Sequence, residues 1–382
     1  MKQHSTTAQL KTTVTKTTRR DLQKRAKQEE LTIGLDLGDR QTHVCILSAK
    51  GDVLLAEKLN TTKTGFNSLF ESLAPTRVAL EAGTHSPWAS RHLQSLGHEV
   101  IVANPRQVQL ITESARKNDR IDAEKLARLA RVDPKLLSPI HHRSEQAQLD
   151  LAHIRAREHM VYSRTGFINS ARGQAKSLGV RLESCDADQV SKEMSKHFSE
   201  EIQAVLNPLL ELAAVITAQI KEADQRIQQI AKRYPVIELL TPIWGVGTLT
   251  ALAFVLTLGE QQRFDTSRQV GSYLGLTPGQ SQSGKSDPQQ RITKQGDRTM
   301  RWLLVQCAHC IVRRDAPDSD LKRWGLRKID GLKNGKGKPR KKKVIVAVAR
   351  KLGVLMHHLW TNGEVYDPLY NAKAQQKKSG VA

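Results

Sequence analysis

The sequence predicts an α/β domain in the N-terminal part of the chain, followed by long helices and a mostly helical C-terminal domain. Short apolar runs separated by turn residues begin at Leu31 and have the pattern of strands. Strand patterns vanish after about residue 140, where the chain becomes helical and basic. Apolar residues then recur every three or four positions up to Ile230, which is the spacing of an apolar helix seam. The 382 residues are enough for two or three domains that each bury a core.

Basic residues exceed acidic ones along the whole chain. There are 60 Lys and Arg against 38 Asp and Glu, which gives a formal net charge of +22. Such a chain attracts a polyanion, and a nucleic acid is the favoured partner. The charge alone also fits an RNA-associated structural protein or a protein that binds membrane surfaces. Residues 1–30 are polar and without periodicity, which predicts a disordered basic arm without the apolar core of a signal peptide. We therefore expect a cytoplasmic protein with no membrane partner.

The predicted α/β domain covers residues 31–140. The runs LTIGLDLG, THVCILSA and DVLLAEKL are separated only by turn residues, which predicts a meander of three antiparallel strands. A helix near 65–73, a strand in RVALEA, a helix around 88–96, a strand in HEVIVANP and another helix follow. Three antiparallel strands followed by alternating helix and strand are typical of the ribonuclease H-like fold rather than of a Rossmann fold.

The helical middle of the chain is predicted over residues 141–235. It is basic from Ser144 to Gly179, and its apolar seam then continues until Tyr234-Pro235 ends the helix. The seam fits a helical hairpin within one chain, and it also fits a coiled coil that joins two subunits. In the second case we expect Ile220 and Ile227 to lie between the subunits.

The C-terminal domain is predicted over residues 236–370, with a basic tail at 371–382. Within it, PIWGVGTLTALAFVLTLG predicts a helix-hairpin-helix-like motif. Gly245 and Gly247 would permit the tight turn, and the next helix would offer free amides to a DNA phosphate. The run GLKNGKGKPRKKK predicts a flexible basic loop before a closing helix. In MRWLLVQCAHCIVRR, an amphipathic helix pattern favours buried thiols at Cys307 and Cys310 over metal ligation.

Four acidic residues form a candidate metal site. Asp36 lies among apolar residues in the first strand, where a carboxylate is unfavourable unless it binds a cation or takes part in chemistry. Glu81 ends the fourth strand, and Asp119 and Asp122 are three apart at the start of a helix, so they share one face. Carboxylates that meet at one sheet edge are hard oxygen ligands for Mg²⁺ or Mn²⁺.

Each of these acids also has an ordinary structural explanation, as a helix cap, a first-turn charge or a surface residue. Their combination favours the metal site. The IGLDLG run also resembles the first phosphate loop of actin-like ATPases, but the second phosphate loop and the adenosine motif of those proteins are not found.

A polar loop rich in Ser and Gly follows a short apolar helix within RFDTSRQVGSYLGLTPGQSQSGKSDPQQRITKQ. This composition leaves hydroxyl groups exposed beside the basic side chains of Lys285, Arg291 and Lys294, which we expect to contact nucleic acid. Taken alone, any serine in the loop would be interpreted as a solvated residue.

The chain resembles the insertion-sequence transposases that join an N-terminal RuvC-like DEDD domain to a C-terminal transposase domain with a catalytic serine. These enzymes are also known as bridge-RNA-guided recombinases. The matching stretches lie between about residues 31 and 310, in the order of the family. They are GLDLGDRQTHVCIL, ALEAGTHSPW, NPRQV, KNDRIDAEKLA, IWGVGTLTA, RFDTSRQVGSYLGLTP, the SG within QSQSGKS, and ITKQGDRTMRWLL.

The resemblance implies a role for each candidate residue. The metal-binding tetrad would be Asp36, Glu81, Asp119 and Asp122. Ser283 would be the nucleophile that forms a covalent phosphoserine with DNA, although Ser281 and Ser286 are close neighbours in the loop. The resemblance also implies dimers that assemble through a coiled coil into a tetramer, in which the serine of one subunit completes the acidic site of another. It further implies a noncoding guide RNA that pairs with donor and target DNA.

The sequence therefore predicts a transposase that cleaves double-stranded DNA at specific sites and transfers the strands. One alternative is a hydrolytic nuclease or Holliday-junction resolvase, in which the same acids activate water. Another is a nonenzymatic nucleic-acid-binding protein with a decayed site, against which the presence of all four acids argues.

Overall fold

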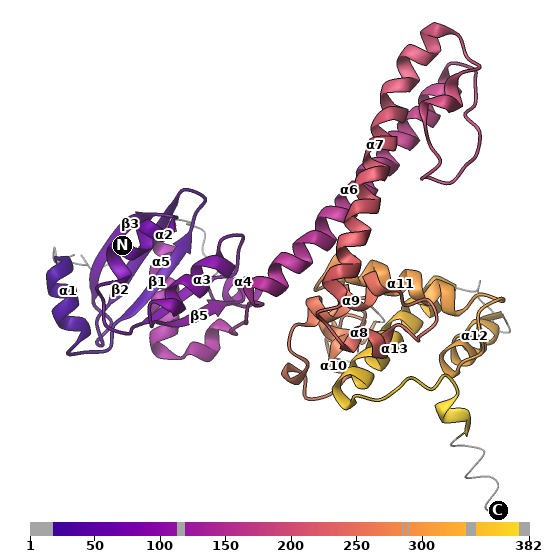
Figure 1. Ribbon diagram of the computed structural model, residues 1–382. Coiled ribbons are helices and arrows are strands. Elements are labelled where there is room, and N and C mark those ends of the chain that lie inside the picture. The colour runs from indigo at the N-terminus through magenta and orange to yellow at the C-terminus, as the bar shows by residue number, and fades with distance from the viewer. Residues whose placement is uncertain (1–17, 113–118, 285, 289, 334–340, 374–382) are drawn as a thin grey trace, which may run out of the picture. The chain divides into compact units, whose positions relative to one another are not determined.

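The computed structural model describes residues 18–112, 119–284, 286–288, 290–333 and 341–373 (Figure 1). The chain divides into two compact units, Met1–Glu145 and Gln146–Ala382. The predicted basic loop at 331–343 and the predicted tail at 371–382 fall partly outside the described residues, as does most of the predicted arm at 1–30.

The first unit is built on a five-stranded mixed sheet. Its strands are β1 (Thr32–Leu37), β2 (Gln41–Leu47), β3 (Val53–Asn60), β4 (Arg77–Glu81) and β5 (Glu99–Ala103). The strand order is β3-β2-β1-β4-β5, with β1, β2 and β3 antiparallel and with β4 and β5 parallel to β1. The predicted meander followed by alternating helices and strands is confirmed.

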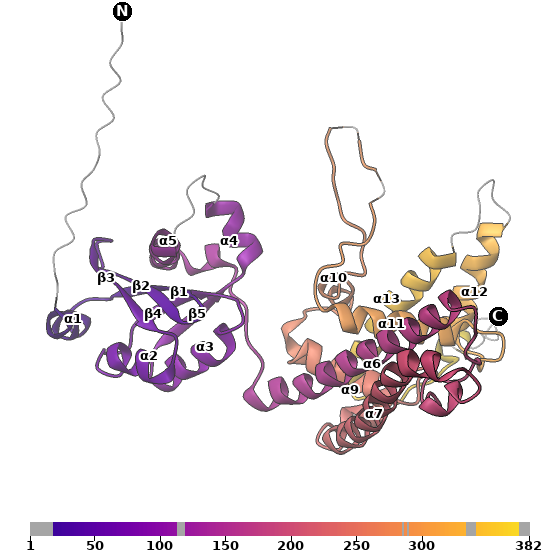
Figure 2. The same cartoon turned by 90° about the horizontal axis from the view of Figure 1, so that it is seen from above.

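Helices cover both faces of this sheet (Figure 2). They are α1 (Arg19–Ala26), α2 (Lys63–Phe70), α3 (Ser86–Ser95), α4 (Pro105–Thr112) and α5 (Asp119–Val132), with a short 3-10 helix, η1 (Pro134–Leu137). Phe66 and Phe70 of α2 and Leu93 of α3 are fully buried in the core on one face. On the opposite face α5 packs through small side chains, among them Ala123 and Ala127.

The prediction of disorder is wrong for residues 19–26, which form helix α1. Thr18 caps this helix with a reciprocal capping box to Asp21. Leu22 is fully buried in the sheet core, and Arg19 pairs with Glu57 of β3 at 3.0 Å. Burial of a single leucine side chain contributes about 1.5–3 kcal/mol, which is enough to attach a short polar helix to the sheet.

The close approach of α5 to β1 depends on Gly34. A Cβ atom at Gly34 would lie 1.9 Å from the carbonyl oxygen of Ala123 and 2.6 Å from the amide nitrogen of Ala127. Only glycine lets the two backbones lie this near to each other. Because α5 is held against β1, its first turn reaches the end of the sheet at which Asp36 lies.

The second unit begins with two long antiparallel helices, α6 (Glu145–Ser177) and α7 (Glu200–Ala231), separated by a short 3-10 helix, η2 (Lys192–Ser195) (Figure 1). Arg157 on α6 pairs with Asp224 on α7 at 2.8 Å. Ile220 and Ile227 are 4% and 2% exposed within one chain. The expectation that these two isoleucines lie between subunits is therefore wrong, because packing within the chain already buries them.

A buried polar cluster ties the base of this hairpin together. Asp150 of α6 is 1% exposed, and it accepts hydrogen bonds from the Tyr234 hydroxyl at 2.6 Å and from the side-chain amide of Gln146 at 2.9 Å. Asp150 also pairs with Arg233. Burial, and then the hydrogen bond with Asp150, raises the pKa of Tyr234 to about 12. The phenol therefore remains a neutral donor over the whole physiological range.

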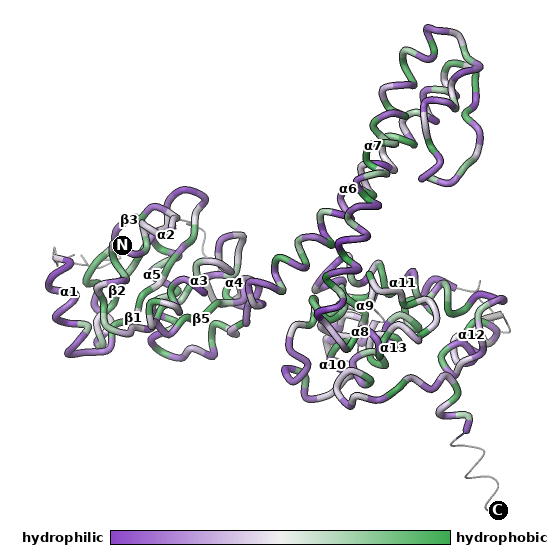
Figure 3. The backbone as a smooth tube through the Cα atoms, in the orientation of Figure 1, coloured by the Kyte–Doolittle hydropathy of each residue, from purple (hydrophilic) through white to green (hydrophobic). Residues whose placement is uncertain are grey.

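A second apolar stripe on α7 stays exposed. Val205, Leu212 and Val215 are 43%, 46% and 62% exposed. In Figure 3 hydrophobic and hydrophilic stretches alternate along α7. Among the described residues α7 is the one helix long and apolar enough to cross a membrane by length and composition, a test that core helices of soluble proteins also pass.

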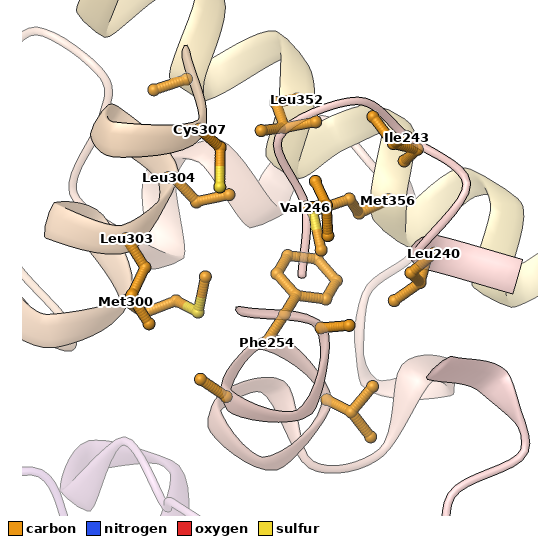
Figure 4. Packing of buried hydrophobic residues seen from close by; sticks show 14 of the residues in the cluster. Leu240, Ile243, Val246, Phe254, Met300, Leu303, Leu304, Cys307, Leu352 and Met356 are labelled. Carbon is orange, nitrogen blue, oxygen red and sulfur yellow. The ribbon is translucent and has the colours of Figure 1, made fainter. Parts of the chain in front are cut away.

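The remaining helices form a compact C-terminal core. They are α8 (Val236–Leu240), α9 (Thr248–Leu258), η3 (Gln261–Arg263), α10 (Gln269–Tyr273), α11 (Arg298–Ile311), α12 (Asp320–Lys333) and α13 (Lys341–Asn362). Figure 4 shows Phe254 of α9 within this core, together with Met300 of α11 and Met356 of α13. Cys307 is buried, as its helix pattern predicts, and burial raises the pKa of its thiol to about 11, whereas Cys310 is only half-buried.

Candidate functional site

Asp36 and Glu81 lie at the same edge of the sheet. Asp36 is the next-to-last residue of β1 and Glu81 is the last residue of β4, and these two strands are parallel neighbours. The carboxyl ends of adjacent parallel strands meet at one edge, so both acids extend from it. Asp36 is half-buried, whereas Glu81 is exposed.

The first turn of α5 adds two more acids to this edge. The side chain of Asp119 is 66% exposed, and its Oδ2 lies 3.7 Å from Nε2 of His43. His43 is the residue of β2 directly opposite Asp36 in the strand register. Asp122 follows Asp119 by about one helical turn, and its Oδ1 lies 3.5 Å from Nζ of Lys125. The structure thus brings residues from β1, β2, β4 and α5 to one end of the sheet.

The pKa of Asp36 reflects the presence of the other acidic residues at this end of the sheet. Burial first, and then the charges of Asp119, Asp122 and Glu81, together raise the pKa of Asp36 to about 6, against the opposing effect of His43. The other three predicted acids are therefore all close enough to act on Asp36. Their donor set suits a hard divalent cation, which would relieve this mutual repulsion.

The four carboxylates do not form a closed ligand set. In the described part of the chain, no group of three or more His, Cys, Asp and Glu side chains is arranged closely enough to hold a metal ion. The side chains are neighbours on the sheet edge, but a cation would have to draw them together.

A contact between His85 and Asp39, in the turns that follow β4 and β1, was not anticipated from the sequence. The indole N–H of Trp88 donates a hydrogen bond to Nδ1 of His85 at 3.2 Å. This bond places the ring proton on Nε2, which lies 3.5 Å from Oδ1 of Asp39. Asp39 follows Asp36 by three residues, and His85 follows Glu81 by four. A histidine in the turn after an acid-terminated strand, in EAGTH, is the signal that could have indicated it.

The predicted turn glycines differ in their roles. Gly245 has a positive φ of 85°, and a Cβ there would lie 3.0 Å from Cβ of Cys310, so both conformation and packing favour glycine. Gly247 is the N-cap of α9, and a Cβ there would meet nothing within 4 Å. Gly247 is exposed, so the N-terminus of α9 begins at the surface.

Ser283 lies in the long loop between α10 and α11. Figure 2 shows this loop extending from α10 as an arm. Ser283 and Ser286 exchange backbone hydrogen bonds of 3.1 and 2.9 Å, and Gly284 in the turn between them has a φ of 54°. Further along, Pro278 pairs with Ile292. The hydroxyl of Ser283 is exposed and has no hydrogen-bond partner among the described residues. Ser281 and Ser286 are exposed on the same arm.

Two of the three basic residues predicted to contact nucleic acid near this loop lie within the described residues. Arg291 and Lys294 are exposed on the side of the arm that leads back to α11. Lys294 has a backbone φ of 55°, which is unusual for a residue other than glycine. Lys285 lies outside the described residues. The acidic residues belong to the first unit and the serine arm to the second.

Two family models match the chain, and together they cover more than half of it. Residues 33–179 match a model described as a transposase and labelled DEDD and IS110. Residues 237–322 match the transposase IS116/IS110/IS902 family. The first match contains all four acids, and the second contains Gly245, Gly247 and the whole serine arm.

Curated relatives are similar over most of their length. The transposase for insertion sequence element IS1328 of Yersinia enterocolitica is 27% identical over 288 residues, 74% of this chain and 84% of the relative. The transposase for IS1111A of Coxiella burnetii is 26% identical over 351 residues, 90% and 93% of the two chains. The pilin gene-inverting protein of Moraxella lacunata is 25% identical over 289 residues, 73% and 77%.

Proposed function

Because the chain belongs to the IS110/IS116 family of transposases, we propose that it cuts DNA at specific sites and rejoins the strands through a phosphoserine intermediate. The single observation that carries this proposal is the convergence of four carboxylates on the edge at Asp36. The likeness to a protein named for inverting a pilin gene supports a site-specific rearrangement. The enzyme would act on DNA in the cytoplasm.

The fold supports the assignment of the acidic residues. The strand order β3-β2-β1-β4-β5, with an antiparallel β1–β2–β3 meander, fits the RuvC-like, ribonuclease H-like arrangement expected from the sequence. In that arrangement Asp36, Glu81, Asp119 and Asp122 would hold Mg²⁺ or Mn²⁺. The cation would supply Lewis-acid stabilisation of charge on the scissile phosphate.

The side chains of the protein would then perform the remaining steps. The Ser283 oxygen attacks phosphorus, the bond between phosphorus and a deoxyribose oxygen breaks, and that oxygen leaves with the proton that serine loses. The new serine–phosphate ester conserves the phosphodiester, so a second strand's hydroxyl reverses the step without ATP. The amides at the start of α9, after Gly247, and the exposed Arg291 and Lys294 would hold the DNA backbone.

Self-association would follow the exposed stripe of α7 rather than the buried isoleucines. Val205, Leu212 and Val215 recur on one side of α7 and are exposed in one chain. A second copy that packs there would form the dimer, and two dimers would form the tetramer. The guide RNA is part of the proposal on the strength of the family resemblance alone.

The proposed phosphoserine is tested with a nicked suicide substrate from which the broken end escapes. Wild-type protein is expected to remain attached to DNA after denaturation, with the phosphate on Ser283 by mass spectrometry. Ser283→Ala should lose the adduct and strand transfer together, whereas Ser281→Ala and Ser286→Ala serve as matched controls on the same arm. Cleavage by Ser283→Ala with no adduct from any variant would favour the hydrolytic nuclease.

The proposed metal site is tested with Asp36→Asn and Asp122→Asn. The amide keeps the size of the side chain but removes the anionic ligand, so strand transfer in Mg²⁺ should be abolished while DNA binding is retained. Glu124→Gln, on the same helix and paired with Arg128 at 2.7 Å, is the matched control and should remain active. Full activity of either aspartate variant would refute the tetrad.

A further inference from the structure

A cavity of about 860 Å³ lies in the second unit, between α12, α13 and the segment that follows α13. Its volume falls within the roughly 300–1,000 Å³ that is common for small-molecule sites. None of the residues assigned above to catalysis or DNA contact lines it. Its walls combine three aromatic side chains with three arginines, namely Trp324, Tyr366, Tyr370, Arg268, Arg323 and Arg327.

The acidic residues of the lining already have partners. Asp320 accepts a hydrogen bond of 2.6 Å from a backbone N–H, and Asp367 pairs with Lys373 at 2.9 Å. Glu364 accepts a hydrogen bond of 3.0 Å from the side-chain amide of Asn362. The negative charge of the lining is therefore largely compensated within the chain.

The three arginines of the lining differ in whether their charge is paired. The guanidinium of Arg323 lies 2.6 Å from a carboxylate oxygen of Asp318. Arg268 and Arg327 have no ion-pair or side-chain hydrogen-bond partner among the described residues, and both are exposed to the cavity's solvent. The unsatisfied charge of the cavity is positive, and guanidinium groups bind phosphate with paired hydrogen bonds.

The aromatic side chains offer a planar ligand a surface. The Lys351 ammonium lies 4.7 Å from the ring centroid of Trp324, so a cation already occupies one face of that indole. Tyr370 is 66% exposed and has no ring partner among the described residues. An exposed tyrosine beside unpaired arginines is the combination that binds the base and the phosphate of an unstacked nucleotide.

We propose that this cavity binds one unpaired nucleotide of a nucleic-acid strand, with its base against Tyr370 and its phosphate at Arg268 and Arg327. A simple anion would leave the aromatic wall unused, and an apolar peptide would leave two arginines uncompensated. The site is separate from the proposed cleavage chemistry, and its test does not require an active enzyme.

The experiment measures binding of fluorescent pentathymidylate and pentauridylate to the full chain by anisotropy. Tyr370→Ala should weaken binding by about 5- to 100-fold, the usual effect of removing one stacking ring. Arg268→Gln and Arg327→Gln should each reduce the slope of log Kd against log salt by about 0.7. The matched controls are Tyr162→Ala, at a ring 76% exposed on α6, and Arg226→Gln on α7.

Photocrosslinking locates the bound strand. Bromodeoxyuridine and thiouridine in the two probes should crosslink to peptides that line the cavity, and the stronger probe identifies the natural sugar. Equal affinity of Tyr370→Ala and Tyr162→Ala would overturn the proposal. So would crosslinks confined to other parts of the chain, or competition by inorganic phosphate at the concentration at which the oligonucleotide binds. Unchanged melting temperatures show that the variants are folded.

Discussion

Replacing Gly34 by alanine tests how the acidic edge is assembled. The new methyl carbon would lie 1.9 Å from the carbonyl oxygen of Ala123, whereas Cβ atoms essentially never approach another atom within 3.0 Å. Helix α5 must therefore move away from β1 by at least about 1 Å. The contact is with backbone atoms of α5, so no side-chain rotation can relieve it. Asp119 and Asp122 move with the helix, away from Asp36.

Two effects of different size are expected. Overpacking of this kind destabilises a protein by about 1–3 kcal/mol, so the melting temperature of Gly34→Ala should fall by several degrees. A displacement of about 1 Å in a catalytic group can lower a rate by roughly 100-fold. Strand transfer should therefore fall far more than the folded fraction does at the assay temperature.

The assay compares strand transfer in Mg²⁺ with circular dichroism and thermal melting of the same samples. Gly166→Ala, in α6, is the control, because a methyl group there meets nothing within 4 Å and alanine favours a helix by about 0.5–1 kcal/mol. Wild-type rates and melting for Gly34→Ala would show that α5 is not held by this contact. Equal losses in the folded fraction and in the rate would show destabilisation without misplacement.

Three further predictions concern separate parts of the chain. His85→Ala is expected to slow DNA cleavage about tenfold at unchanged DNA affinity, because it removes the N–H that faces Asp39; an unchanged rate would limit His85 to packing. Replacing Leu212 and Val215 together by Asp should dissociate the oligomer in sedimentation without lowering the melting temperature, since both side chains are exposed in one chain; an unchanged mass would exclude this stripe as the interface. Burial lowers the pKa of His98 below 6.5, so its neutral form stabilises the fold fully above pH 6.5, and this contribution is lost as the pH falls toward the folded-state pKa. Denaturant midpoints at pH 7.5 and pH 5 should therefore differ less in His98→Gln than in wild type, and equal differences would contradict this role.

The sheet could be predicted because its signals are local. Alternating apolar runs and turn residues define β1 to β5, and an acid placed in an apolar strand indicated Asp36. The histidine in EAGTH could have drawn attention to His85, but its partner Asp39 could not be predicted, because the contact depends on which turns meet in the folded sheet. Helix α1 was missed for a related reason: Leu22 is its one buried residue, so no periodic pattern marks it.

The long helices show what periodicity leaves open. Apolar residues on α7 follow two stripes, and the spacing alone does not say which stripe packs within the chain. Ile220 and Ile227 proved to be internal, whereas Leu212 and Val215 remained exposed. The arm that bears Ser283 is held by backbone hydrogen bonds, which do not depend on side-chain type and leave no apolar pattern to predict from.

The isolation of the Ser283 hydroxyl has a pharmacological consequence. In serine hydrolases a neighbouring histidine makes the hydroxyl reactive at rest, and reagents such as fluorophosphonates exploit that state. Among the described residues no base contacts Ser283, so its oxygen keeps the low nucleophilicity of an ordinary alcohol. Such reagents should leave this protein unlabelled, and a small-molecule inhibitor would be better directed at the acidic edge around Asp36.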